Sequence, residues 1–193
     1  MGRDAMGSAP HNDSIRTNSR PGSLLGRFLH DSRGATAIEF AMLAIPFSLM
    51  VFAILESCIS FGGSQILTNA TDDIARQFRT GQIRTINETD LKTMVCDRIK
   101  IIVENNCPGL VVDLRKFDTF AEAADVRLKF TADNDLDTAG FKVELGPAQT
   151  INMLRVFYKW PVMTDFMSLA MSNLKDGKTL HFAEVVWKNE PFN

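Results

Sequence analysis

The chain has 193 residues, of which 45% are hydrophobic and 23% are charged, and its formal net charge at pH 7 is −2. This length accommodates one domain of ordinary size with an appendage, and the hydrophobic share excludes a chain that is disordered throughout. The net charge and the lack of a long basic stripe give no basis for a nucleic-acid partner.

The first 34 residues are polar and have neither a helical nor a strand period. They are rich in Gly, Ser, Asn and Pro, and they contain five arginines against three aspartates. We expect residues 1–34 to form a flexible polar leader without a core of its own.

A long apolar run follows the leader. Residues 40–55 are sixteen consecutive residues without a charge, and residues 35–61 would form a helix of about 40 Å. Because a hydrocarbon core is about 30 Å thick, Glu39 and Glu56 fall near its two interfaces. Pro46 is tolerated in a membrane helix and kinks it. The sequence therefore predicts a transmembrane helix over residues 35–61, with a helix buried in a soluble protein as the alternative.

Two targeting signals are weaker interpretations of the same run. A cleavable secretory signal ends at a small-x-small site, whereas this run ends in ESCISFGG at residues 56–63. The sequence LESC at residues 55–58 approaches a lipoprotein box, but Glu56 occupies a position that normally holds a small residue. The leader arginines favour a cytoplasmic N-terminus and place residues 62–193 across the membrane.

The segment RGATAIEF at residues 33–40, followed by an apolar run with a proline, Glu56 and FGG, resembles a known family. It is similar to the TadE-like minor pilins, or pseudopilins, of the tight-adherence (Tad/Flp-type) pilus system. Softer similarities follow in NATDDIARQFRTGQI, in YKWPVMTDF, in NEPF and in the pair Cys96 and Cys107. The resemblance covers about residues 33–193. The end of the apolar run, ESCIS at residues 56–60, departs from the Glu-aromatic-Gly sequence that is more usual in this family.

This resemblance implies cleavage between Gly34 and Ala35 by a prepilin peptidase, a membrane aspartic protease. Glu39 and Phe40 then become the fifth and sixth residues of the mature chain. Cleavage frees an ammonium at Ala35, and Glu39 lies one turn later on the same helix face. Its carboxylate can pair with that ammonium or with one of a neighbouring subunit, and snorkelling to lipid headgroups is the alternative.

Two helices are expected in the exported part. After Gly62 and Gly63 a helix restarts, with an apolar residue every four positions up to Phe78 and with Gly81 as its C-cap. A second helix is expected over residues 87–105, where the sequence CPG stops it.

Alternating apolar and polar residues then predict strands, with a short helix after Pro161. The strands are expected at residues 110–115, 126–130, 141–145, 152–160 and 179–187. Short links between them favour an antiparallel sheet. The predicted fold class is α+β: a long N-terminal transmembrane helix leads into a pilin-like domain with two helices and about four or five strands.

Two of the three cysteines lie in the region that is expected to be exported. Cys96 and Cys107 can close a short loop in an oxidising compartment, which contributes about 2–3 kcal/mol. A regular helix up to Asn105 would carry them out of disulfide reach, so the helix must bend back or end early. Two buried thiols are the alternative. Cys58 is expected at the membrane and unpaired.

Patterns for catalysis or metal binding are sparse. His11 and His30 lie in the leader, and His181 is expected at the surface or rim of a strand. Four carboxylates have the offsets of an EF-hand calcium loop: Asp133, Asp135, Asp137 and Glu144. Thr138 replaces the turn-making glycine, however, and a solvated hairpin loop is the simpler interpretation. We expect no enzyme activity, no cofactor and no small-molecule substrate.

Three functions were weighed on these grounds. The favoured one is a minor pilin of the inner membrane whose partners are the prepilin peptidase, other pilins and inner-membrane assembly proteins, with a role in pilus assembly, adherence or biofilm formation. The alternative is an uncleaved, membrane-anchored periplasmic binding or scaffold subunit of a secretion or pilus machine. A periplasmic enzyme is disfavoured, because no catalytic constellation is found in the sequence.

Overall fold

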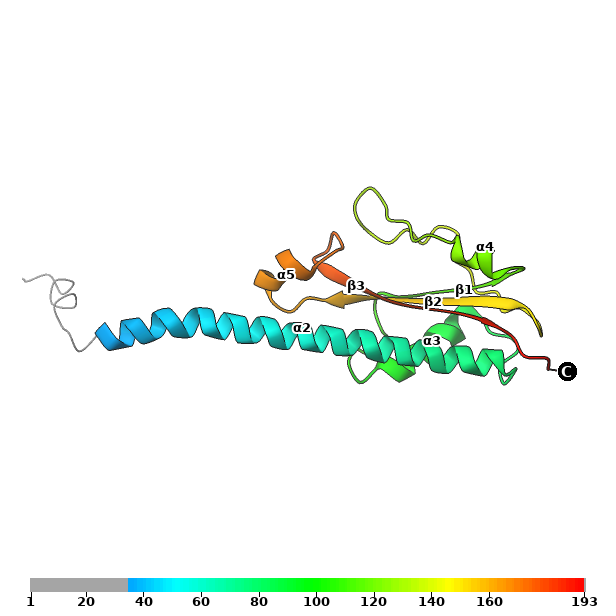
Figure 1. Ribbon diagram of the computed structural model, residues 1–193, viewed down its shortest axis with the longest axis horizontal. Helices are drawn as coiled ribbons and strands as arrows, with labels where there is room; N and C mark the ends of the chain where they lie inside the picture. Colours follow the sequence, from blue (N-terminus) through cyan, green and yellow to red (C-terminus); the bar gives the residue numbers. More distant parts are fainter. Residues whose placement is uncertain (1–34, 193) are drawn as a thin grey trace, which may run out of the picture. The chain divides into compact units, whose positions relative to one another are not determined.

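The structure is a computed structural model that describes residues 35–192 (Figure 1). The leader predicted at residues 1–34, including Gly34, lies outside the described residues. The elements in chain order are α2 (Ala35–Arg79), α3 (Glu88–Ile99), β1 (Leu110–Phe117), α4 (Phe120–Ala124), β2 (Ile151–Pro161), α5 (Asp165–Met171) and β3 (Lys178–Lys188). Contacts divide the chain after Ser48, and the sheet belongs to the unit Leu49–Asn193.

Helix α2 is one continuous helix of 45 residues, which corrects the expected restart after Gly62 and Gly63. A Cβ atom at Gly63 would lie 2.7 Å from the ring of Trp160, whereas a Cβ at Gly62 would meet nothing within 4 Å. Gly63 therefore does not interrupt the helix. It lets the Trp160 ring lie directly against the helix backbone.

The C-terminal end of α2 agrees with the prediction for Gly81. This residue has φ +72°, and its N–H donates to the carbonyl of Phe78 over 3.1 Å. The N–H of Gln82 donates to the carbonyl of Gln77 over 3.0 Å. These two bonds form a Schellman motif, in which glycine supplies the left-handed conformation.

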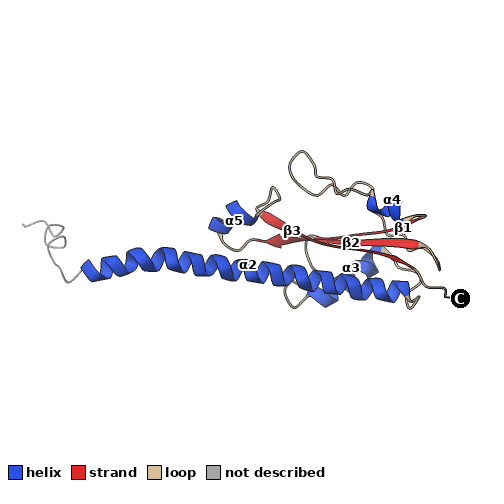
Figure 2. Ribbon diagram, in the orientation of Figure 1, coloured by secondary structure: helices blue, strands red, loops and turns tan. Residues whose placement is uncertain are grey.

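The sheet has three antiparallel strands in the order β1-β2-β3, with Val156 of β2 opposite both Val112 and Ala183. Figure 2 shows α3 on one side of the sheet and α4 with the loop that follows it on the other. The α3 side holds the core, to which residues 67–78 of α2 also contribute. Its largest fully buried apolar members include Phe78, Ile74, Leu91, Ile99, Leu114, Leu154, Val95 and Val156.

The strands expected at residues 126–130 and 141–145 are not formed within the described residues. Only single bridges remain there, one between Leu114 and Val143 and one between Phe130 and Leu136. The first is held by two backbone bonds of 2.7 Å: the N–H of Leu114 donates to the carbonyl of Lys142, and the N–H of Glu144 donates to the carbonyl of Leu114. It stops there because the N–H of Gly146, which would make the next bond to β1, donates instead to Oδ1 of Asn152 over 2.8 Å.

Helix α3 confirms the disulfide and corrects the expected end of the second helix. It ends at Ile99 rather than near residue 105, and the chain then turns back through Asn106 and Cys107, both with positive φ. This early end brings the Cα atoms of Cys96 and Cys107 to 5.7 Å, and their sulfur atoms are bonded. Cys58 is free and exposed.

The contact at Gly63 generates a prediction. Gly63→Ala should destabilise the detergent-solubilised chain by about 1–2 kcal/mol, because overpacking against Trp160 outweighs the gain in helix propensity. Gly62→Ala is the matched control and should stabilise the chain by about 0.5–1 kcal/mol. Thermal unfolding should therefore rank Gly62→Ala above the wild type and Gly63→Ala below it. Equal stabilisation by both substitutions would refute the packing at Gly63.

Candidate functional site

The N-terminal part of α2 has apolar side chains that nothing in the described chain covers. The helix is long and apolar enough to cross a membrane, and no residue of its most apolar 18-residue window is buried. The exposed residues are Phe40, Met42, Leu43, Ile45, Phe47, Leu49, Met50, Phe52, Ile54 and Leu55. An apolar surface of this extent on a helix indicates contact with lipid or with other apolar helices.

The residues predicted for processing and packing lie in this part of the chain. Ala35 is the first described residue of α2, and Glu39 and Phe40 follow on exposed helix surface. No hydrogen bond or ion pair of the Glu39 carboxylate is found among residues 35–192. Pro46 lies inside the helix. The cleavage site and the pairing of Glu39 with a new N-terminus stay predictions.

Glu56 has a defined partner in the sheet domain. Its side chain is buried, and one carboxylate oxygen accepts the backbone N–H groups of Met163 over 2.5 Å and Thr164 over 3.2 Å. The other oxygen accepts the Thr164 hydroxyl over 2.5 Å. Thr164 is also the N-cap of α5. Glu56 thus joins α2 to the segment that connects β2 with α5.

One turn after Glu56, Ser60 makes a second buried polar contact. Its hydroxyl lies 2.9 Å from Nε2 of His181 on β3. The His181 ring stacks on Trp160, with the ring centroids 5.0 Å apart, and Tyr158 lies opposite His181 in the strand register. His181 is therefore buried, which corrects the expectation of a surface or rim position.

Burial has a consequence for the protonation of His181. The desolvation of its ring lowers its pKa below the ordinary value of 6.5. Because folding disfavours the charged form of this ring, its contribution to stability is complete above about pH 6.5 and is lost as the pH falls through the folded pKa.

Glu56, Ser60, Gly63 and Leu67 follow one another at intervals of three or four residues. They lie on one face of α2, and each is buried. The sheet domain therefore begins to cover this face of α2 at Glu56. Sequence reasoning located Glu56 at a membrane interface and missed its partner. A signal for the partner was present, since Thr164 is a typical N-cap before a short helix, but nothing in the sequence joins it to Glu56.

The four carboxylates of the candidate calcium loop have separate partners. Lys159 donates to both oxygens of Asp135 over 2.6 and 2.8 Å, and this hydrogen bond holds the pKa of Asp135 below its usual value. Asp133 pairs with Lys175, Asp137 accepts the N–H of Ala139, and Glu144 pairs with Lys142. No cluster of three or more metal ligands occurs in the described part of the chain.

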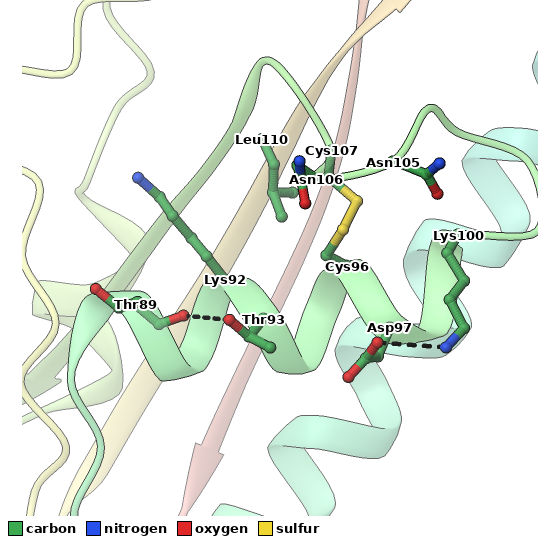
Figure 3. A pocket seen from close by; sticks show the side chains of 10 residues that line it. All are labelled: Thr89, Lys92, Thr93, Cys96, Asp97, Lys100, Asn105, Asn106, Cys107 and Leu110. Atoms are coloured by element: carbon green, nitrogen blue, oxygen red, sulfur yellow. Dashed lines mark hydrogen bonds and ion pairs between the residues drawn. A yellow bond between two sulfur atoms is a disulfide. The ribbon is translucent and has the colours of Figure 1, made fainter.

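An open cavity of about 660 Å³ adjoins the disulfide (Figure 3). Besides Cys96 and Cys107, its wall includes Lys92, Thr93 and an ion pair between Lys100 and Asp97. The Thr93 hydroxyl donates to the carbonyl of Thr89, one helical turn earlier. This hydroxyl is therefore engaged within helix α3.

The bonds of Glu56 generate a prediction. Glu56→Gln keeps the shape but replaces charged hydrogen bonds by neutral ones, so it should destabilise the chain by about 1–2 kcal/mol. Amide exchange at residues 163–168 should accelerate, while amides of β2 stay protected. Glu104→Gln, at an exposed carboxylate, is the matched control and should change stability by less than about 0.5 kcal/mol. Unchanged exchange at residues 163–168 in Glu56→Gln would show that this contact does not hold the segment.

Comparison with known protein families gives a match for the segment that contains most of α2. Residues 34–76 match the family model described as TadE-like protein. No curated protein and no solved structure gives a match. The family match confirms the resemblance to the TadE-like proteins that the segment RGATAIEF indicates.

Proposed function

We propose that the chain is a minor pilin, or pseudopilin, of a Tad/Flp-type pilus, cleaved after Gly34 by a prepilin peptidase. The observation that carries the proposal is that α2 is one helix with two environments. Its first part exposes apolar side chains, and its last part contributes to the core of the sheet domain. A helix of this kind can anchor a subunit in the membrane and later pack against the same helix of other subunits.

The dimensions of the exposed part support a single membrane crossing. Residues 35–55 precede the first buried contact at Glu56, and 21 helical residues extend about 31 Å. A bilayer has a hydrocarbon core of about 30 Å. We therefore place the end of the membrane-spanning part near Glu56, whose carboxylate already has three donors from the sheet domain.

The orientation of α2 in the membrane is proposed from the segments that precede and follow its apolar part. The leader arginines favour a cytoplasmic N-terminus in the inner membrane. The Cys96–Cys107 disulfide suits an oxidising compartment, so residues 56–193 are placed in the periplasm. The subunit then presents its leader to a peptidase at the cytoplasmic face.

Glu39 has a role in this proposal only after cleavage. Its carboxylate has no partner in the described part of the chain, and a charge at the edge of a bilayer needs one. Removal of the leader creates an ammonium at Ala35, one turn before Glu39. The new N-terminus of the same subunit or of its neighbour would supply the missing charge and align adjacent helices.

Processing is tested by co-expression with a prepilin peptidase and N-terminal sequencing of the membrane-extracted chain. The wild type should begin at Ala35, and Gly34→Arg should reduce the cleaved fraction more than tenfold, because the long side chain obstructs the peptidase. Gly26→Arg makes the same change within the leader and should leave cleavage intact. An intact leader on the wild type would overturn the proposal and favour an uncleaved scaffold subunit.

A second substitution separates processing from assembly. Glu39→Ala should be cleaved like the wild type but should fail to enter or support pili, because the ammonium at Ala35 loses its partner. Pilus yield is measured in sheared cell-surface fractions, with Glu39→Asp as the charge-preserving control. Normal pilus yield with Glu39→Ala would contradict the proposed role of the carboxylate.

A further inference from the structure

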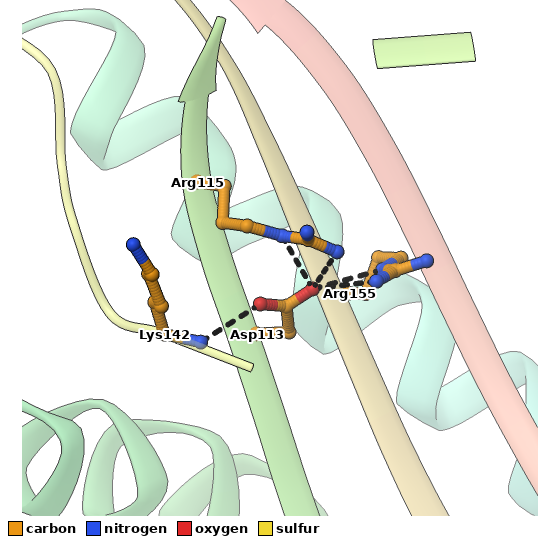
Figure 4. A network of polar contacts seen from close by, with 4 residues as sticks. All are labelled: Asp113, Arg115, Lys142 and Arg155. Atoms are coloured by element: carbon orange, nitrogen blue, oxygen red, sulfur yellow. Dashed lines mark hydrogen bonds and ion pairs between the residues drawn. The ribbon is translucent and has the colours of Figure 1, made fainter. Parts of the chain in front are cut away.

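The face of the sheet opposite the helices α2 and α3 carries a buried ionic cluster. Asp113 of β1 and Arg155 of β2 are 0% and 1% exposed, and they lie directly opposite each other in the strand register. Two arginines donate to the same carboxylate oxygen of Asp113, Oδ2. Arg155 donates over 2.7 and 3.1 Å, and Arg115 donates over 2.8 and 3.0 Å. The other oxygen accepts the N–H of Lys142 over 3.0 Å (Figure 4).

This cluster has an excess of positive charge. Two guanidinium groups share one carboxylate, and Nη1 of Arg155 has no hydrogen-bond partner. It is the one buried side-chain nitrogen or oxygen atom in the described part of the chain that lacks a partner. A buried N–H of a charged group is costly to leave unpaired, so Nη1 indicates a missing acceptor.

Neighbouring groups do not supply that acceptor. The rings of Phe141 and Phe157 lie 5.4 and 5.9 Å from the guanidinium carbon of Arg155. They interact with the face of the guanidinium through cation–π contacts, whereas its N–H groups lie in its plane. Glu184 is opposite Arg155 in the register with β3, but it is exposed, and no hydrogen bond joins the two side chains within the described residues.

A cavity of about 330 Å³ adjoins this cluster. Its charged lining consists of four cations and two carboxylates: Arg115, Arg127, Lys129, Arg155, Asp125 and Asp137. Asp137 is engaged with the N–H of Ala139, and Asp125 is exposed at the C-cap of α4. At the rim, Gly140 leaves open space where a Cβ would stand. The cavity is therefore accessible and has a net positive lining.

We propose that this cavity binds an oxyanion of the carboxylate or phosphate type. Arg155 would donate from Nη1, and the exposed side chains of Arg127 and Lys129 would close over the anion. Asp113 holds Arg155 and Arg115 in place, so the guanidinium fork is ordered before the ligand arrives and little rotamer freedom is lost on binding. The ligand would balance the excess charge of the cluster. This inference does not depend on processing after Gly34.

The test uses the full chain in detergent at constant ionic strength, with chloride replaced by inorganic phosphate in one series and by citrate in another. Calorimetric titration measures the affinity, and thermal unfolding measures the stabilisation that follows from binding to the folded state. The wild type should bind at least one of the two anions with a saturable rise in Tm. Binding of citrate alone assigns a carboxylate ligand, and binding of phosphate alone assigns a phosphate ligand.

Substitutions assign the binding to the cavity. The double variant Arg127→Ala, Lys129→Ala should lose at least tenfold in affinity, and its Tm without anion should stay near that of the wild type because both side chains are exposed. Lys116→Ala with Lys188→Ala removes the same charge from exposed strand positions outside the cavity and should bind within twofold of the wild type. Arg155→Lys keeps the charge but removes the fork, and it should also lose at least tenfold.

Two results would overturn the proposal. One is a wild type whose Tm and heat of titration respond to neither anion at constant ionic strength. The other is equal affinity of the Arg127→Ala, Lys129→Ala variant and the Lys116→Ala, Lys188→Ala control, which would show that the anion binds by general charge and not in this cavity.

Discussion

The hydrogen bonds between the Glu56 carboxylate and residues 163–164 fix the point at which α2 changes its environment. Before Glu56 the helix exposes apolar side chains, and from Glu56 onward one face of it is covered by β2 and β3. A carboxylate can be buried there because three donors replace its water. The proposed membrane boundary and the position of the N-cap of α5 both depend on this contact.

A single helix that is apolar enough to cross a membrane at one end and contributes to a domain core at the other needs no linker between the two parts. Gly63 shows how the two requirements are met, because it lets Trp160 approach the helix axis without an interruption of α2. Ser60 adds a buried polar contact to His181 of β3. The helix is thereby joined to the strands through several contacts of different kinds.

Features that depend on one element could be predicted from the sequence, and features that depend on contacts between elements could not. The apolar run, the Gly81 cap and the Cys96–Cys107 bond were predicted correctly, because each has a local periodic or spacing signal. Gly62 and Gly63 suggested a break, since a glycine for close packing looks like a glycine for a turn. Residues 141–145 alternate between apolar and polar side chains, but they pair with β1 only at a single bridge and form no strand. The Glu56 contact and the unpaired Nη1 of Arg155 join residues far apart in the sequence.

The most direct test of the account is the depth of α2 in a lipid bilayer. Spin labels at Phe52, at the native Cys58 and at Gln65 are compared in proteoliposomes, with Cys58→Ser as the background for the two introduced cysteines. Collision rates with oxygen and with a water-soluble nickel chelate report the depth of each label. The account predicts that the label at residue 52 is in the hydrocarbon core, that the label at 58 is at the interface and that the label at 65 is in water. Labels at 58 and 65 as deep as the label at 52 would contradict a membrane boundary at Glu56.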